Sequence, residues 1–348
     1  MLFFFLIFAS FAGIYFLKKN SANGRLLTWK VSFSALIKHP LGVGLGHFPN
    51  AYGEAQIAYF SSGNASEMEE YVAGNTEYCF NEFLQIAIES GFVSLLLFIG
   101  MLFCSIRGLI KSKDWGAFGA LTSLLVFAFF SYPFSVLPFL IVFVCLLSIS
   151  GTRITRIKKD YKFKSMILMA VGCLTITGIC IYKQYPVYHA YKKWNTNQKY
   201  YEREMYREVV QSYEPLYPYL KDRILFLFEY GRSLSQSEQP EKSNEVLRHA
   251  TQISCDPMLY NIMGKNYQAM KAYDLAEASI RKSAQIVPNR IYPYYLLMKL
   301  YIETGDREKA VENADIVLTK EPKVYSTAVR EMREEAKSIR KITENHNE

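Results

Sequence analysis

Long apolar runs occupy only the first half of the chain. The runs lie before residue 183, at residues 2–17, 92–106, 117–131, 134–149 and 165–182. Each is at or slightly below the roughly 20 residues that an α-helix needs to span a bilayer. Residues 183–348 contain no comparable run and are rich in Lys, Glu, Tyr and Arg. The pattern predicts a membrane domain at residues 1–182 with about five helices, followed by a polar domain at residues 183–348.

The third and fourth apolar runs are separated only by Tyr132 and Pro133. Proline fixes its own φ and lacks a backbone donor, so it breaks or kinks a helix. We therefore predict a helical hairpin with a tight turn, and one long kinked helix is the alternative. For the first run, residues 2–17, a secretory signal is the alternative to a membrane helix. Lysines rather than small residues follow that run, which favours the membrane helix.

Basic residues indicate how these helices are oriented. Residues 107–114 carry three Lys or Arg side chains and residues 151–164 carry six. Cytoplasmic loops of membrane proteins have an excess of such residues. Because successive membrane helices cross in opposite directions, the long loop, residues 18–91, and the whole of residues 183–348 are placed on the side opposite the cytoplasm. In a bacterial inner membrane, that side is the periplasm.

Charge and cysteine content exclude several classes of function. The formal net charge is +8, but the densest basic cluster lies between two apolar runs, which is typical of a membrane flank rather than of a nucleic-acid-binding surface. Of the six cysteines, only Cys79 and Cys255 fall on polar stretches. Their spacing predicts neither a disulfide framework nor a metal site. We expect no cofactor, no metal and no nucleic acid.

The polar domain repeats with a period of about 33 residues. Residues 257–290 form one unit, and the same order of aromatic, small and proline positions recurs in the next unit, up to Pro322. Small residues such as Ala276 and Ala310 let two helices approach closely, and proline ends the second helix. Residues 224–256 match more loosely. The pattern predicts an α-solenoid similar to tetratricopeptide repeats, which bind protein partners, and a generic amphipathic bundle is the alternative.

Three motifs follow one another in the long loop. They are GRLLTW at residues 24–29, HPLGVGLGHFPNAY at 39–52 and FNEFLQIAIESGF at 80–92. In this order, beside apolar runs, they resemble the C-terminal half of the O-antigen ligase and polymerase family, and with the repeats they resemble its Bacteroidota type. The resemblance covers residues 1–151. Members usually carry many more helices before this loop, so it implies a C-terminal half, as a truncated or split chain.

The resemblance implies an all-α, polytopic membrane enzyme. Its reaction would be transfer or polymerisation of a glycan carried on undecaprenyl pyrophosphate, at the periplasmic face of the inner membrane. The implied partners are the lipid-linked glycan donor, a glycan or lipid acceptor, and membrane lipids. A non-catalytic, membrane-anchored scaffold, whose repeats recruit proteins of envelope assembly, is the alternative.

The resemblance also implies which residues are catalytic. Arg25 matches the family's loop arginine, which is implied to contact the lipid diphosphate, and a guanidinium binds phosphate oxygens bidentately. Where ligases of the family have a His-Asn pair, this chain has Phe80 and Asn81. The missing histidine favours a polymerase, a ligase with another acceptor, or an inactive relative. Glu77 and Glu82 are candidates to orient or deprotonate an acceptor hydroxyl, and the alternative is that they are exposed acids near a helix start.

Other loop residues are candidates for substrate binding. Lys30 adds positive charge on the same stretch as Arg25, and Trp29 and Tyr52 could stack on sugar rings. Aromatic residues at a membrane boundary are also common without a ligand. His39 and His47 are the histidines of the loop, and either could replace the missing base or be structural.

Two glycine-containing stretches of the loop predict local structure. LGVGLG, residues 41–46, lacks the spacing and the preceding strand of a phosphate-binding loop, so we predict a turn with positive φ angles. Residues 55–75 are polar and rich in Gly and Ser. We expect this second stretch to form a mobile cover over the site.

Overall fold

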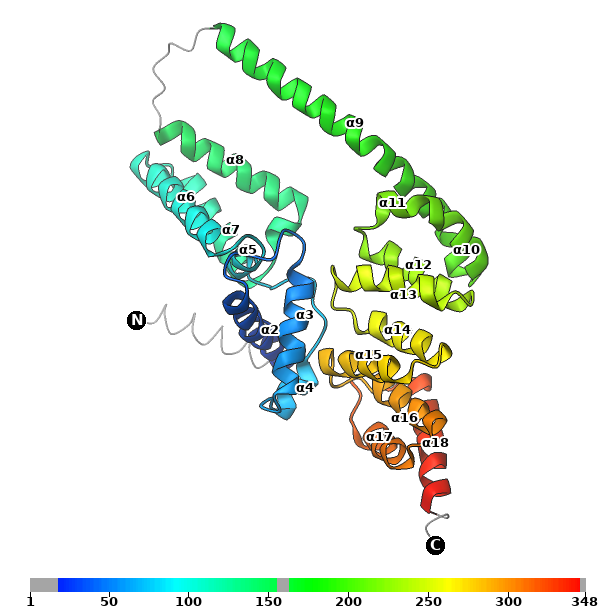
Figure 1. The fold of residues 1–348 in the computed structure, drawn as a ribbon. Helices are drawn as coiled ribbons and strands as arrows, with labels where there is room; N and C mark the ends of the chain where they lie inside the picture. Colours follow the sequence, from blue (N-terminus) through cyan, green and yellow to red (C-terminus); the bar gives the residue numbers. More distant parts are fainter. Residues whose placement is uncertain (1–17, 155–162, 345–348) are drawn as a thin grey trace, which may run out of the picture.

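The computed structural model describes residues 18–154 and 163–344 (Figure 1). Within these ranges, every regular element is a helix and there is no β-strand. The predicted all-α class is therefore confirmed. The first apolar run, residues 2–17, lies outside the described residues.

Three apolar helices lie side by side: α6 (Phe92–Lys111), α7 (Trp115–Phe130) and α8 (Leu137–Ile154). A short 3-10 helix, η1 (Pro133–Ser135), separates α7 from α8. Proline starts this turn, and the chain reverses there, so the predicted hairpin is confirmed. Many large apolar side chains of these helices are exposed, which is typical of a surface that faces lipid.

The long helix α9 (Phe163–Glu202) follows, and it has 40 residues. It contains the last apolar run and continues well past residue 182, so the expected domain boundary falls inside one helix. Among the described residues, α6 and the part of α9 at Ile167–Glu202 are long and apolar enough to cross a membrane. None of the residues in the most apolar window of α9 is buried within the chain.

The long loop folds into four helices: α2 (Lys19–Lys38), α3 (Phe48–Ser61), α4 (Glu67–Val72) and α5 (Glu82–Ser90). Residues from α2, α3 and α5 share one apolar core, and Cys255 from the second half of the chain belongs to it as well. Residues 55–75, expected to be a mobile cover, include the end of α3 and all of α4. This stretch packs on the repeats instead, because α3 contacts α15.

The glycine turn before α3 has the positive φ angles that we predicted, at 91° for Gly42, 103° for Gly44 and 76° for Gly46. The backbone N–H of Gly44 donates to the carbonyl of Glu89, 2.9 Å away, at the end of α5. A Cβ on Gly42 would lie 2.7 Å from the same carbonyl oxygen. Glycine is needed at this turn because two backbone segments approach each other closely.

The second half forms a solenoid of helical hairpins. Its paired helices are α12 (Ile224–Gln236), α13 (Pro240–Thr251), α14 (Pro257–Ala269), α15 (Tyr273–Ile286), α16 (Tyr292–Thr304) and α17 (Arg307–Thr319), and α18 (Thr327–Glu344) packs against the last pair. A Cβ on Gly264 would lie 2.4 Å from Ile280 Cγ1, and one on Gly231 would lie 2.6 Å from Leu247 Cδ2. The repeat spacing thus corresponds to close helix contacts, and the predicted solenoid is confirmed.

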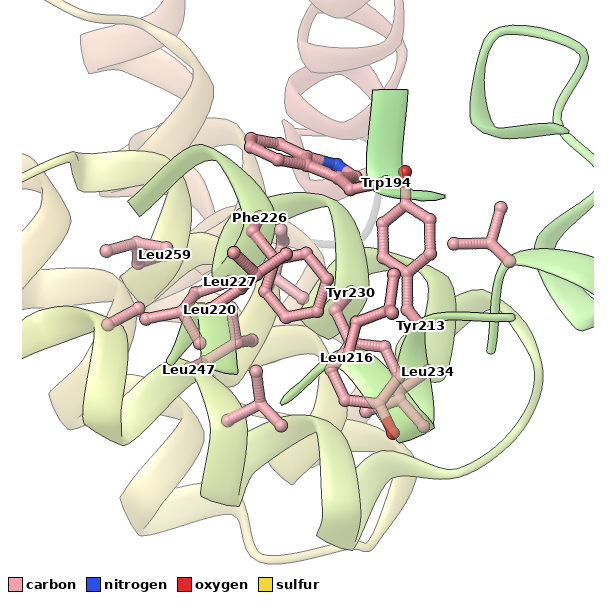
Figure 2. Close-up of a cluster of buried hydrophobic side chains, with 14 of the residues drawn as sticks. Trp194, Tyr213, Leu216, Leu220, Phe226, Leu227, Tyr230, Leu234, Leu247 and Leu259 are labelled. Carbon is pink, nitrogen blue, oxygen red and sulfur yellow. The ribbon is translucent and has the colours of Figure 1, made fainter. Parts of the chain in front are cut away.

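The end of α9 is built into the first part of the solenoid, together with α10 (Tyr206–Tyr213), η2 (Glu214–Leu216) and α11 (Tyr217–Leu220). Figure 2 shows Trp194 of α9 beside Phe226 of α12 in the shared core; their ring centroids are 5.7 Å apart. The buried carboxylate of Glu229 accepts hydrogen bonds from Trp194, Gln198 and Tyr213, each 2.8 Å long. The membrane-length helix and the repeats are therefore joined by a packed core.

Candidate functional site

Arg25 lies on the exposed face of α2, where that helix meets the end of α7. Its Nη1 atom donates to the carbonyl oxygen of Phe130 at 3.3 Å, and its Cζ atom lies 5.4 Å from the centre of the Phe80 ring. A cation over an aromatic face is held by the ring's negative charge density. Within the described part of the chain, no carboxylate forms an ion pair with Arg25. The guanidinium is thus fixed in place while its charge remains available to an anion.

The Phe80 ring belongs to a small aromatic group beside Arg25. It meets Tyr132 edge to face at 5.5 Å, and Tyr132 stacks on Tyr78 at 4.4 Å. Phe80 has a φ of 54°, which is unusual for a bulky residue. The backbone beside it is tied down, since the indole N–H of Trp29 donates to the carbonyl of Cys79 at 3.1 Å.

Asn81 and Glu82 are buried and hold the backbone. Asn81 caps α5 by accepting a hydrogen bond from the N–H of Leu84 at 3.0 Å. The Glu82 carboxylate accepts from the N–H of Phe134 at 2.6 Å, which ties α5 to the turn before α8. Burial raises the pKa of Glu82 to about 7, although the bond from Phe134 opposes this, and nearby Glu89 adds to the rise.

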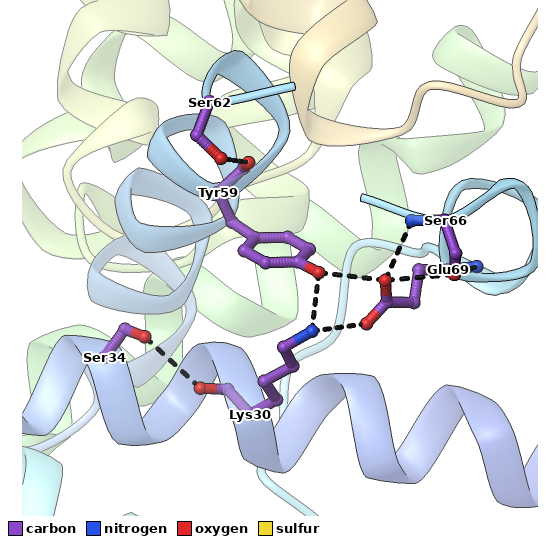
Figure 3. Close-up of polar contacts among 6 residues, drawn as sticks. All are labelled: Lys30, Ser34, Tyr59, Ser62, Ser66 and Glu69. Carbon is purple, nitrogen blue, oxygen red and sulfur yellow. Dashed lines mark hydrogen bonds and ion pairs between the residues drawn. The ribbon is translucent and has the colours of Figure 1, made fainter. Parts of the chain in front are cut away.

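Lys30 is paired within the loop (Figure 3). Its Nζ lies 2.7 Å from Glu69 Oε1 and 2.6 Å from the hydroxyl oxygen of Tyr59. Tyr59 and the N–H of Ser66 both donate to the other Glu69 oxygen, at 2.9 Å. Partial burial disfavours the charged carboxylate, but the hydrogen bonds from Lys30, Ser66 and Tyr59 outweigh it and lower the pKa of Glu69 to about 2. Lys30 thus joins α2, α3 and α4 and has its charge matched internally.

Two of the expected sugar-stacking residues belong to the loop core. Tyr52 is fully buried and stacks on Phe48, with ring centroids 5.7 Å apart. Trp29 is half-buried and lies 5.9 Å from Phe129 of α7, edge to face. Tyr52 therefore has no ring face open to a sugar, and Trp29 packs on the end of α7.

The remaining candidates lie at the surface of the loop. His47 is exposed and precedes α3, and its Nδ1 lies 3.0 Å from the carbonyl oxygen of Leu45. His39 is half-buried and follows α2. Glu77 is exposed, one residue before Tyr78. Phe80, which stands where ligases of the resembled family have a histidine, contacts Arg25.

Tyr78 and Tyr132 were not anticipated as parts of the site. Tyr132 was recognised only as half of a helix-breaking turn, and its pairing with Tyr78 depends on how α7 packs on α5. The sequence signal for this aromatic group was the presence of aromatic residues on both sides of Pro133, at Tyr132 and Phe134. Within residues 18–154 and 163–344, no group of three or more His, Cys, Asp or Glu side chains is placed to hold a metal ion.

Comparison with known proteins agrees with the loop motifs. A family model described as O-antigen ligase matches residues 1–99, which contain all three motifs and the start of α6. Together with the apolar helices, this match indicates a membrane protein. No curated protein matches the chain. Two solved structures are similar to part of it, "Crystal structure of MamA" (16% identity, 42% of this chain and 90% of that chain, TM-score 0.35) and "Crystal structure of MamA protein" (15%, 44%, 88% and 0.35).

Proposed function

We propose that this chain takes part in the transfer or polymerisation of a lipid-linked glycan at the periplasmic face of a bacterial inner membrane. Arg25 binds the diphosphate of the undecaprenyl-linked donor. The observation that carries the proposal is the exposed guanidinium of Arg25. It is held by Phe80 and the Phe130 carbonyl without an acidic partner in the described part of the chain, and it lies within the segment that matches O-antigen ligase.

An exposed apolar surface supports a position of α2 at the lipid boundary. Large apolar side chains are exposed along α2 and the following turn, at Leu26, Phe33, Ile37, Leu41 and Leu45. The turn is joined to the start of α6, because the N–H of Phe92 donates to the carbonyl of Pro40 at 3.0 Å. Exposed apolar residues continue along α6. A helix lying in the interface would hold Arg25 at the level of lipid head groups.

The chemistry needs a group that stabilises the departing diphosphate. Negative charge grows on the bridging oxygen as the glycosidic bond breaks, and an arginine placed there binds more strongly in the transition state than in the ground state. Glu77 is the exposed acid closest in sequence to the aromatic group, and we assign it to orient the acceptor hydroxyl and to take its proton as the hydroxyl oxygen bonds to the anomeric carbon. His39 and His47, beside the glycine turn, contact the glycan. Asn81 and Glu82 act by holding the backbone that carries Phe80.

The test is the surface glycan of cells that carry variants of the intact gene. Arg25→Ala should reduce the glycan ladder by roughly 100-fold, the scale seen when a transition-state donor is removed. Arg25→Lys should retain part of it. Lys38→Ala is the matched control, because Lys38 is also an exposed cation on α2. Its Nζ lies 3.8 Å from Glu54 Oε2, which is a long distance for an ion pair. A normal ladder from Arg25→Ala, at normal protein level, would exclude the proposed function.

A second candidate function is a non-catalytic scaffold whose repeats hold envelope proteins. The observation that favours it is Phe80 in the place of the family's histidine, with Asn81 and Glu82 both buried in structural roles. If the chain is a scaffold, Arg25→Ala will leave the glycan phenotype intact. Pull-down with the whole chain would then recover the same proteins from wild-type and variant cells.

A further inference from the structure

One side chain of the solenoid holds the end of α4. Asn289 lies between α15 and α16, and the two N–H groups of its Nδ2 are shared among three carbonyl oxygens, those of Glu70 (3.0 Å), Tyr71 (2.8 Å) and Ala73 (3.0 Å). Carbonyl groups at the C-terminal end of a helix lack partners within that helix. Asn289 supplies a hydrogen-bond donor for these carbonyl groups, although it is more than 200 residues away in sequence. The Asn289 side chain is itself buried.

Other polar side chains cross the same interface. They donate to backbone carbonyls: Gln56 to Ile286, Asn50 to Thr251 (2.7 Å) and Lys323 to Ala73 (2.9 Å). A bond to a carbonyl fixes where the backbone runs. Gln56 and Asn50 thus hold the backbone of the solenoid against α3, whereas Lys323, together with Asn289, holds the backbone of the loop at the end of α4.

The apolar part of the interface is closely packed. Cys255, which precedes α14, is 4% exposed and belongs to the core of the loop. A Cβ added to Gly53 of α3 would lie only 2.2 Å from the Cβ of Cys255. The Cys255 thiol also lies 4.0 Å from the carbonyl oxygen of Thr76. A residue of the repeats thus completes the loop core.

A short segment connects this interface to Arg25. Residues 73–80 begin at Ala73, bound by Asn289, and end at Phe80, whose ring lies under the Arg25 guanidinium. Cys79, next to Phe80, is fully buried in the same loop core as Cys255. The segment is held by the solenoid at one end and contacts the candidate site at the other.

We infer that Asn289 is a positioning residue for the Arg25 site. By holding the end of α4, it fixes residues 73–80 and thereby keeps Phe80 against Arg25. This face of the solenoid is a docking surface for the chain's own loop. The inference rests on the proposed function only for what Arg25 does, because the positioning itself is a property of the fold.

Buried thiols provide a readout that does not depend on glycan transfer. Burial raises the pKa of both Cys79 and Cys255 to about 12, so both remain unreactive thiols while they are covered. The test uses the full chain in membranes, with the cysteines of the apolar helices replaced by serine, at Cys104, Cys145, Cys173 and Cys180. Maleimide labelling rates of the two remaining thiols are then measured by mass spectrometry.

We expect Asn289→Ala to speed labelling of both Cys79 and Cys255 by about tenfold or more, because local opening becomes easier. Lys323→Ala removes one bond to Ala73 and should act in the same direction with a smaller effect. Asn313→Ala is the matched control, since Asn313 is buried and its side-chain amide donates to the carbonyl of Lys309 within its own helix, at 2.8 Å, and not to a loop carbonyl of the described residues. It should leave both rates unchanged.

Three results would overturn the inference. One is a wild-type labelling rate in Asn289→Ala, and another is an equal increase in Asn313→Ala. The third is faster labelling of Cys255 alone, because Phe80 would then be held without Asn289. Failure of the proposed function is seen separately, as a normal glycan ladder from Arg25→Ala, and it leaves the labelling result unaffected.

Discussion

The guanidinium carbon of Arg25 lies 5.4 Å from the centre of the Phe80 ring, although the two residues are 55 positions apart in the chain. Ligases of the family that this loop resembles have a histidine at the position of Phe80. A phenyl ring attracts the cation through its face but neither takes nor gives a proton. Phe80 can therefore support the arginine, but it cannot act as a base.

The first prediction concerns this ring. Phe80→Leu removes the aromatic face but keeps an apolar side chain, and it should cost the Arg25 contact about 0.5–1 kcal/mol. We expect the glycan ladder to fall two- to fivefold, on the basis of that energy. Phe80→Tyr keeps the ring and should retain the ladder. Equal ladders from the Leu and Tyr variants would show that the aromatic face is not used.

The second prediction concerns the Glu82 carboxyl, whose pKa is about 7 in the folded chain against an ordinary 4.5. Between these values the folded chain binds more protons than the unfolded chain, so stability should fall as pH rises from 4.5 to 7. Glu82→Gln keeps an acceptor for the Phe134 N–H and removes the charge. At pH 8 it should unfold at a higher temperature than wild type, as measured by thermal unfolding in detergent.

Glu82→Ala is the matched comparison for that variant. It leaves the Phe134 N–H without its acceptor and should destabilise the chain by about 1–3 kcal/mol at every pH. If Glu82→Gln instead unfolds below wild type at pH 8, the charge of the buried carboxylate stabilises the fold, and burial does not raise the Glu82 pKa.

The third prediction concerns acid stability. The pKa of Glu69 is about 2 in the folded chain against an ordinary 4.5, so its contribution is complete above pH 4.5 and is lost as pH falls toward 2. Because the Glu69 side chain remains 23% exposed, we expect only about 1 kcal/mol. Lys30→Ala should move the acid transition to higher pH, as measured by tryptophan fluorescence. Lys38→Ala should not move it, and a shift of equal size there would indicate a general charge effect.

The fourth prediction concerns the junction of α9 and the solenoid. Glu229→Ala removes the acceptor of two buried donors, Trp194 and Tyr213, and of the partly buried Gln198, and it should destabilise the chain by about 1–3 kcal/mol. Glu229→Gln keeps one strong acceptor and should cost less. Thermal unfolding of the full chain in detergent provides the measurement. Similar melting temperatures for the Ala variant and wild type would mean that water satisfies these donors.

Local patterns were sufficient to predict most helices but not how the two halves meet. Apolar runs and Pro133 indicated α6 to α9, and the spacing of Gly231 and Gly264 indicated the repeats, because both signals arise within single elements. Docking of the loop depends on single polar side chains, such as Asn289, that bond to backbone carbonyls. Such bonds require no particular residue in the partner, so they leave no periodic trace in the sequence.

The candidate site was predictable to the same limited extent. Arg25 was identified from its motif, whereas the burial of Tyr52 follows from the way α3 packs on α2 and on Cys255. In the sequence, Lys30 is a cation near Arg25 and so a candidate to bind an anionic ligand. The fold brings Glu69, which is 39 positions away, next to it. The contact of Phe80 with Arg25 likewise exists only in three dimensions.

The continuous helix α9 ties the face that its apolar part presents to the direction of the solenoid, because the other end of the helix is packed in the solenoid core. One residue inserted after the apolar run would rotate the apolar part by about 100° relative to the solenoid and shift it by about 1.5 Å. Seven inserted residues make nearly two full turns and almost restore the angle, but they displace the apolar part by about 10 Å along the axis. The length of α9 therefore sets two quantities together, the face that the helix turns toward lipid and the distance between the apolar run and the solenoid core.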